Sequence, residues 1–142
     1  MTTSLNCQAK EAGSFLAAIG RQYASSGKKL AVLAGGETVV HLHGHGKGGR
    51  NQEMALAAAE GIAGLDNVAV FSFGSDGTDG PTDAAGGFAD GHTKQQLEEQ
   101  GIAISDVLDQ NDAYHALAKT GGLLITGATG TNVNDLSVLL IG

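Results

Sequence analysis

The sequence is poor in cysteine, in cationic residues and in long apolar runs. A single cysteine among 142 residues excludes an internal disulfide framework and is typical of a reducing compartment, so a cytoplasmic protein is expected. Eight Lys and Arg residues against fifteen Asp and Glu give a formal net charge of −7, which argues against nucleic-acid binding and against anionic membranes as partners. No apolar run reaches the roughly 18 residues of a membrane span, and the polar start of the chain does not predict a signal peptide.

Tryptophan is absent and proline occurs once, whereas glycine is abundant, with 23 residues. The glycines have no fixed period and apolar segments separate them, which excludes collagen and argues against low complexity. Glycine concentrated between apolar strands indicates backbone that turns sharply or approaches a ligand closely. At this length we expect one domain over residues 1–142.

Alternating helical and extended patterns predict an α/β fold. Helices are expected at about 7–26 (within an N-terminal region of about 1–28), 51–62, 93–100 and 112–119, with a helical turn at 105–108. Strands are expected at 30–34, 38–43, 68–73, 123–126 and 133–141, the third of them central and the last at an edge, and 74–90 is expected to be a long polar loop. The short link between the first two strands favours an antiparallel pair. We therefore expect a mixed, mostly parallel β-sheet flanked by helices.

The glycine-rich loop 44–50 carries the strongest chemical signal. Lys47 and Arg50 are the only Lys or Arg residues within 30–93, and both stand just before a predicted helix. Free N–H groups at a helix start together with two cations favour a small-anion site, where Arg50 can hold phosphate or carboxylate through two parallel hydrogen bonds. A hairpin tip with solvated charges is the alternative. The loop is not a P-loop, because Gly48 follows Lys47 where Ser or Thr is required.

The polar loop after the third strand is rich in aspartate. Carboxylates at a strand exit can hold Mg²⁺ or accept hydrogen bonds from substrate hydroxyls, but aspartate is equally a favoured turn residue. The turn interpretation is favoured for Asp79, and both interpretations stay open for Asp76 and Asp83.

Two further patterns have competing interpretations. The segment 126–132 is similar to a dinucleotide fingerprint, but a strand is expected to follow it, which excludes a Rossmann site; its small hydroxyl residues can still line a polar pocket. His41, His43 and His45 share one face of an expected strand and could ligate zinc, although an exposed polar face gives the same pattern and is favoured.

Five motifs in chain order resemble the MOFRL domain of glycerate 2-kinases, a family in which some members carry the older name hydroxypyruvate reductase. The motifs are 35–37, 46–53, 76–86, 111–114 and 126–136, so the likeness spans nearly the whole chain.

The resemblance implies a function for these motifs. Family enzymes phosphorylate D-glycerate with ATP and a divalent metal such as Mg²⁺, in a cleft between this domain and a larger N-terminal Rossmann-like domain. It implies that Arg50 is a catalytic charge stabiliser. Substrate- or anion-binding roles are expected for Lys47, Gly48, Gly49, Asn51, Glu53, Asp76, Thr78, Asp79, Thr129, Thr131 and Asn132.

The sequence also departs from the family pattern. The 142 residues contain no counterpart of the family's N-terminal domain with its catalytic lysine, and Ala113 stands where Ser is usual. We therefore expect a domain that is catalytically incomplete alone and binds a small anion, glycerate or phosphate, with no metal site or cofactor of its own. Its partner would be a complementary N-terminal domain chain or a second copy. A non-catalytic ligand-binding or self-associating module is the alternative, and a hydroxypyruvate reductase is the weakest one.

Overall fold

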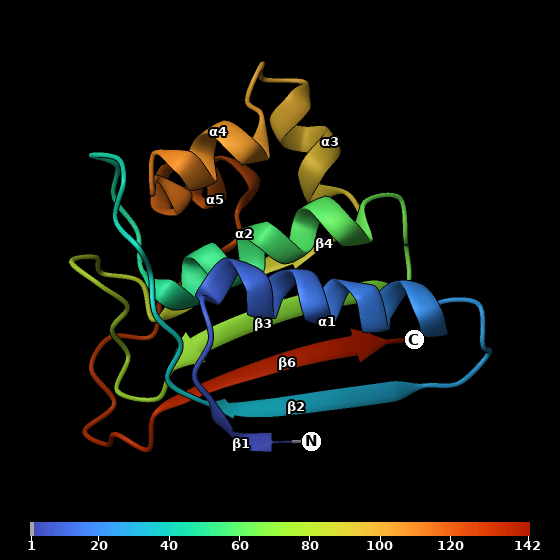
Figure 1. Cartoon of the computed structure of the whole chain (residues 1–142), viewed down its shortest axis with the longest axis horizontal. Helices are drawn as coiled ribbons and strands as arrows, with labels where there is room; N and C mark the ends of the chain where they lie inside the picture. Colours follow the sequence, from blue (N-terminus) through green and yellow to red (C-terminus); the bar gives the residue numbers. More distant parts are fainter. Residues whose placement is uncertain (1) are drawn as a thin grey trace.

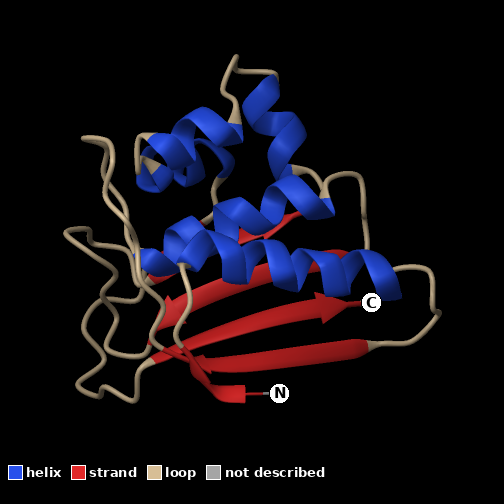
Figure 2. Ribbon diagram, in the orientation of Figure 1, coloured by secondary structure: helices blue, strands red, loops and turns tan. Residues whose placement is uncertain are grey.

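A six-stranded β-sheet with its helices stacked on one side makes up the computed structural model, which describes residues 2–142 (Figure 1, Figure 2). The elements in chain order are β1 (Thr2–Leu5), α1 (Ala9–Tyr23), β2 (Leu30–Gly36), α2 (Arg50–Ile62), β3 (Val68–Gly74), β4 (Gly86–Asp90), α3 (Thr93–Glu98), α4 (Ile104–Asp109), α5 (Ala113–Thr120), β5 (Leu123–Leu124) and β6 (Asp135–Ile141). The expected α/β fold is confirmed. In the part of the chain described, no helix is long and apolar enough to cross a membrane.

The strand order is β1-β2-β6-β3-β4-β5, and only β1 and β2 run parallel to each other. The prediction of a mixed sheet is confirmed, whereas the expectation that it would be mostly parallel is wrong. The difference comes from β6, which enters between β2 and β3 and pairs antiparallel with both along its whole length. The last strand is therefore central and not at an edge.

The segment 38–43 does not form the expected second strand. It makes a single parallel bridge, between Gln8 and Val39, and otherwise follows an irregular course. A hairpin with β2 is impossible, because β6 and β1 already occupy the two sides of that strand. The alternating β-branched pattern was therefore not sufficient to predict a strand here.

The expected loop 74–90 contains a strand that the sequence did not predict, because the strand begins with two glycine residues. Residues Gly86–Asp90 form β4, which pairs antiparallel with β3. A side chain at Gly86 would collide with the carbonyl oxygen of Ser72, so the close approach of the two strands requires glycine, a residue with low strand propensity.

Two hydrophobic clusters form the core, and α2 contributes to both. The first lies between α1, α2 and the inner sheet face and includes Leu16, Met54 and Leu139. The second lies under α3, α4 and α5 and includes Leu56 and Leu117. Because α2 is enclosed in this way, the position of its N-terminus, where the predicted site begins, is fixed by packing on both sides.

Candidate functional site

A cavity of about 930 Å³ lies at one end of the sheet. Three loops that line it lie on the left side of Figure 1. They are the segment after β2, the loop between β3 and β4, and the loop before β6. The lining includes Glu37, Thr38, Gly48, Gly49, Arg50, Glu53, Asp76, Thr78, Asp79, Asn111 and Asn132. Most of the predicted site residues are therefore brought together around one space.

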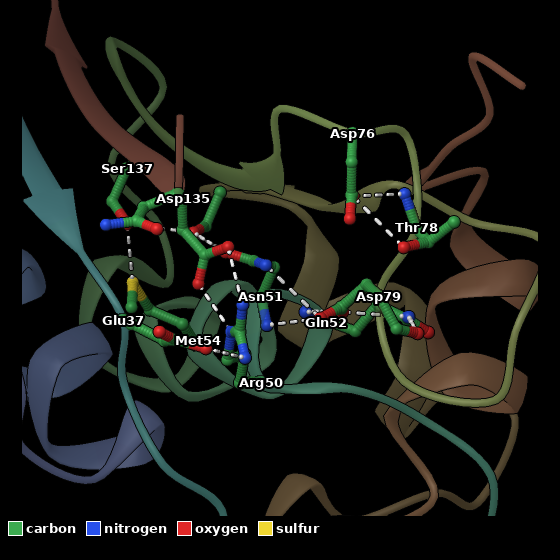
Figure 3. A network of polar contacts seen from close by, with 12 residues as sticks. Glu37, Arg50, Asn51, Gln52, Met54, Asp76, Thr78, Asp79, Asp135 and Ser137 are labelled. Atoms are coloured by element: carbon green, nitrogen blue, oxygen red, sulfur yellow. Dashed lines mark hydrogen bonds and ion pairs between the residues drawn. The ribbon is translucent and has the colours of Figure 1, made fainter. Parts of the chain in front are cut away.

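Arg50 is the first residue of α2 and is held by two carboxylates (Figure 3). Its Nε donates to Asp135 Oδ2 at 2.5 Å and its Nη2 to Asp135 Oδ1 at 3.0 Å, while Nη1 donates to Glu37 Oε1 at 3.0 Å. The hydrogen bonding to Asp135 raises the pKa of the guanidinium further. Three of the five guanidinium N–H groups are thus used, which leaves two for a ligand.

Asp79 occupies the helix start at which an external anion was expected. Its carboxylate accepts from the backbone N–H groups of Asn51 (3.1 Å) and Gln52 (2.9 Å) and from both of their side-chain amides. A side chain at Gly49 would collide with this carboxylate. Burial raises the pKa of Asp79, and the four hydrogen bonds oppose that rise. The positive end of the α2 dipole is therefore neutralised by the chain's own aspartate, and these two amides are not free.

The two predicted cations are separated. Lys47 is not among the residues that line the cavity, and its Nζ lies 4.2 Å from the centroid of the Tyr114 ring. This places it in cation–π geometry. Arg50 is thus the cation of the predicted pair that reaches the cavity.

Glu53 is a buried carboxylate in the cavity wall. Its Oε2 accepts from Asn111 Nδ2 at 3.2 Å, and burial raises its pKa. Asn111 Oδ1 in turn accepts from the backbone N–H groups of His43 and Gly44. Asn111 therefore fixes the glycine-rich loop against Glu53, a role that its position in a sequence motif did not reveal.

Asn51 does not line the cavity. It is fully buried, and its Oδ1 accepts from Ser72 Oγ at 2.6 Å, beside a Ser72–Ser137 contact of 2.8 Å. It therefore acts as an orienting group beneath the site.

The loop between β3 and β4, called the acidic loop, contacts the loop before β6, called the threonine loop. Asp76 Oδ1 accepts from the N–H and hydroxyl of Thr78, and these bonds lower the pKa of Asp76. Thr129 donates to the carbonyl of Ser75 and is not a lining residue; neither is Thr131. Of the three residues predicted in this second loop, Asn132 is thus the one that lines the cavity.

Thr38 is a lining residue that the sequence did not single out. Only 3% of it is exposed, and its Oγ1 has no hydrogen-bond partner in the structure. Buried hydroxyl groups nearly always have one. Thr38 lines the cavity, but less than 1 Å² of its Oγ1 is accessible, so a ligand atom can reach this hydroxyl only when the cavity wall shifts. No sequence pattern distinguishes such a threonine from one in a strand.

The fold and site define an α/β domain whose glycine-rich loops gather around a polar cavity that contains one arginine. The sequence profile of the MOFRL family matches residues 30–135, and the chain belongs to this family.

Relatives support this assignment. The chain is 53% identical to the D-glycerate 2-kinase of Thermotoga maritima and 47% identical to the glycerate 2-kinase of Pyrococcus horikoshii, over 99% of its own length in each case. A crystal structure of glycerate kinase from Thermotoga maritima superposes with a TM-score of 0.97 over the full chain at 53% identity. The chain spans about a third of these relatives, covering 35%, 33% and 35% of their lengths.

The ion pair between Arg50 and Asp135 predicts strong energetic coupling. We expect Arg50→Met to lower the free energy of unfolding by about 2 kcal/mol, because it leaves the buried Asp135 carboxylate without its ion-pair partner. Asp135→Asn should cost less, because the Arg50 side chain is 35% exposed and still contacts Glu37. The double variant should lose less than the sum of the two, by about 1–2 kcal/mol, as measured by urea denaturation. The surface pair Lys94–Glu60 is the control, with a much smaller expected coupling, because solvent screens surface ion pairs. Equal coupling in the two cycles would contradict the prediction.

Because the pKa of Glu53 is raised, replacing it with its neutral isostere glutamine should stabilise the fold in a pH-dependent way. The folded chain holds this proton more tightly than the unfolded chain, so ionisation costs stability as pH rises from the ordinary glutamate pKa through the raised one. Glu53→Gln should therefore become more stable relative to wild type as pH rises across that window, and the gain should level off above it. Urea denaturation at a series of pH values measures this, with Glu11→Gln as the control for loss of one negative charge. A gain that is constant over the pH range would refute the assignment.

Proposed function

We propose that the cavity beside Arg50 is the part of a glycerate kinase active site that this domain contributes, and that it binds glycerate or its phosphate. The observation that carries the proposal is the fixed guanidinium of Arg50, with two N–H groups left over at the edge of the cavity. These groups suit a carboxylate or phosphate oxygen.

The charges of the cavity favour a hydroxy acid over a simple anion. The lining contains four carboxylates (Glu37, Glu53, Asp76, Asp79) and one guanidinium, so a bare anion meets mostly repulsion. A ligand with one anionic group and several hydroxyl groups can contact Arg50 and also donate hydrogen bonds to the carboxylates. Glycerate has this combination.

Arg50 would serve phosphoryl transfer as a charge stabiliser that is already in position. Such transfer depends mainly on positioning and on stabilising charge that develops on oxygen. The two bonds to Asp135 hold the guanidinium in one orientation, so little reorganisation is needed when the charge develops. The Asp135 carboxylate also neutralises part of the guanidinium charge. We therefore expect this domain alone to bind glycerate weakly.

Two observations on the described residues support the proposal that this domain does not hold ATP and Mg²⁺ by itself. These residues contain no group of three or more metal-ligating side chains, and the Asp79 carboxylate already accepts four hydrogen bonds. We propose that ATP and Mg²⁺ are held mainly by a complementary domain, such as the remaining two-thirds of the relatives' length.

The reductase alternative is not favoured by the geometry. The segment 126–132 leads into β6, whereas a dinucleotide site requires a helix whose N-terminus faces the phosphates. The remaining alternative is a ligand-binding module without catalysis. Measuring turnover of D-glycerate distinguishes it from the proposed function.

The proposal predicts that Arg50 is required for phosphorylation. The chain is mixed with a separately produced N-terminal domain of a full-length relative, and ATP-dependent phosphorylation of D-glycerate is measured. We expect activity from the mixture and a loss of about 100-fold with Arg50→Lys, which keeps the charge but cannot reproduce the planar fork. Arg21→Lys on the surface of α1 is the matched control. Binding of D-glycerate without turnover in the mixture would favour the non-catalytic module.

The unsatisfied hydroxyl of Thr38 is a candidate ligand contact, which requires that ligand binding shift the cavity wall and expose Oγ1. Thr38→Val keeps the shape and removes the hydroxyl, so the ligand-free chain should melt no lower than wild type, because no hydrogen bond is lost. The affinity for D-glycerate, measured by calorimetry, should fall by about tenfold.

Thr82→Val is the control, because the Thr82 hydroxyl is bonded within the protein and its loss should lower the melting temperature. Wild type that binds no D-glycerate would refute the proposed function. Wild type and Thr38→Val that bind equally well would refute only the role of Thr38.

A further inference from the structure

The four carboxylates that line the cavity differ in whether they can still accept a proton. Both oxygens of Asp79 already accept two hydrogen bonds each, which uses their lone pairs. The Glu37 side chain is 61% exposed and is paired with Arg50. Asp76 accepts two hydrogen bonds from Thr78, and these lower its pKa. A carboxylate with a low pKa is a weak proton acceptor, so these three are poorly suited to proton transfer.

Glu53 is the fourth carboxylate, and one of its oxygens remains available. Oε2 accepts from Asn111 Nδ2 at 3.2 Å. Oε1 receives no hydrogen bond from the described residues, yet it is not one of the buried polar atoms without a partner. This oxygen is therefore accessible, although only 5% of the residue as a whole is exposed. Because Glu53 lines the cavity, a ligand there can meet Oε1.

Asn111 restricts the direction of that carboxylate. Its Oδ1 accepts from the backbone N–H groups of His43 at 2.7 Å and Gly44 at 3.0 Å, and its Nδ2 also donates to the carbonyl oxygen of His41 at 3.2 Å. The amide cannot rotate without losing these bonds. The backbone of Asn111 has a φ of 55°, in the left-handed region that asparagine tolerates better than most residues. Asn111 is thus a positioning residue that anchors one oxygen of Glu53 and leaves the other free.

Arg50 and Glu53 are neighbours on α2. They stand three residues apart on the helix, a spacing that places two side chains on the same side with their Cβ atoms about 5–6 Å apart. Both line the cavity. A fixed guanidinium can stabilise charge on a group in transfer while the neighbouring carboxylate takes a proton, and phosphoryl transfer from a nucleotide to a hydroxyl group uses both actions.

We propose that Glu53 is the general base that activates the hydroxyl group of the substrate, an inference that rests on the proposed function. Oε1 takes the proton of the hydroxyl group, and the hydroxyl oxygen forms a bond to the terminal phosphorus of a nucleoside triphosphate. The bond from that phosphorus to its bridging oxygen breaks, the bridging oxygen keeps the electron pair, and a nucleoside diphosphate leaves. The proton passes from Glu53 to water after the transfer.

The surroundings of Glu53 suit this task. Burial raises its pKa, which makes the carboxylate a better proton acceptor than an exposed glutamate. The charged and titratable groups that face it come from three parts of the chain. Lys10 of α1 and His43 of the segment after β2 favour the ionised form, whereas Asp79 of the acidic loop opposes it. The ionised form, which the base requires, is thus supported by two of these three groups.

Steady-state kinetics of the chain mixed with the N-terminal domain of a full-length relative tests the general base. Glu53→Gln should lower kcat for D-glycerate about 100-fold. The KM should change less than about threefold, because the amide oxygen of glutamine can still accept a hydrogen bond. Glu53→Asp keeps a carboxylate and should recover about tenfold of the lost rate. Glu11→Gln is the control, because it removes an exposed carboxylate from α1.

The pH dependence separates a base from a structural residue. Because only ionised Glu53 can accept the proton, kcat/KM of wild type should fall as the pH drops through the raised pKa of Glu53. Glu53→Gln should lack this fall, whereas His43→Asn should keep it, which would exclude titration of His43 as the cause. Urea denaturation of each variant chain checks that the fold persists.

The outcomes distinguish this role from the proposed function as a whole. A wild-type mixture that does not phosphorylate D-glycerate would overturn the proposed function and the general base with it. If wild type is active and Glu53→Gln keeps its kcat, or keeps the fall at low pH, only the general base is overturned. A raised KM with an unchanged kcat would also overturn it, because Glu53 would then act in substrate binding.

Discussion

The buried carboxylate of Asp79 at the start of α2 is the contact on which the rest of the site depends. It accepts four hydrogen bonds from Asn51 and Gln52 and so joins the acidic loop to the first turn of the helix. The contact fixes the loop after β3 and the direction in which α2 begins. It also supplies the negative charge that the helix N-terminus favours, so the charge that remains for a ligand comes from Arg50.

The position of Arg50 follows from that contact. The residue precedes Asn51 at the helix start, and its side chain extends to Asp135 at the beginning of β6. Because β6 is hydrogen-bonded to β2 and β3 on its two sides, the carboxylate that orients the guanidinium stands on the most constrained strand of the sheet. A charged group held in this way needs little rearrangement to stabilise a developing negative charge.

The two faces of the sheet have different chemistry. The inner face packs against α1 and α2, whose close approach depends on Gly13, where a side chain would collide with the carbonyl oxygen of Met54. The outer face, which the helices leave uncovered (Figure 2), is apolar and belongs to no core cluster, while polar groups gather in the loops at one end.

The sequence by itself determined the α/β class, the two long helices, the central strand β3 and the glycine-rich loop before α2, because these depend on local periodicity and local backbone preference. It also indicated Arg50, since the isolated pair of cations Lys47 and Arg50 before a helix start is visible in the sequence. Only the tertiary structure decided that β6 is central, that a glycine-rich segment forms β4 and that Lys47 lies outside the cavity. It alone identified Asp135, 85 residues further along the chain, as the partner of Arg50. These features depend on contacts between distant segments, and such contacts leave no periodic signal in the sequence.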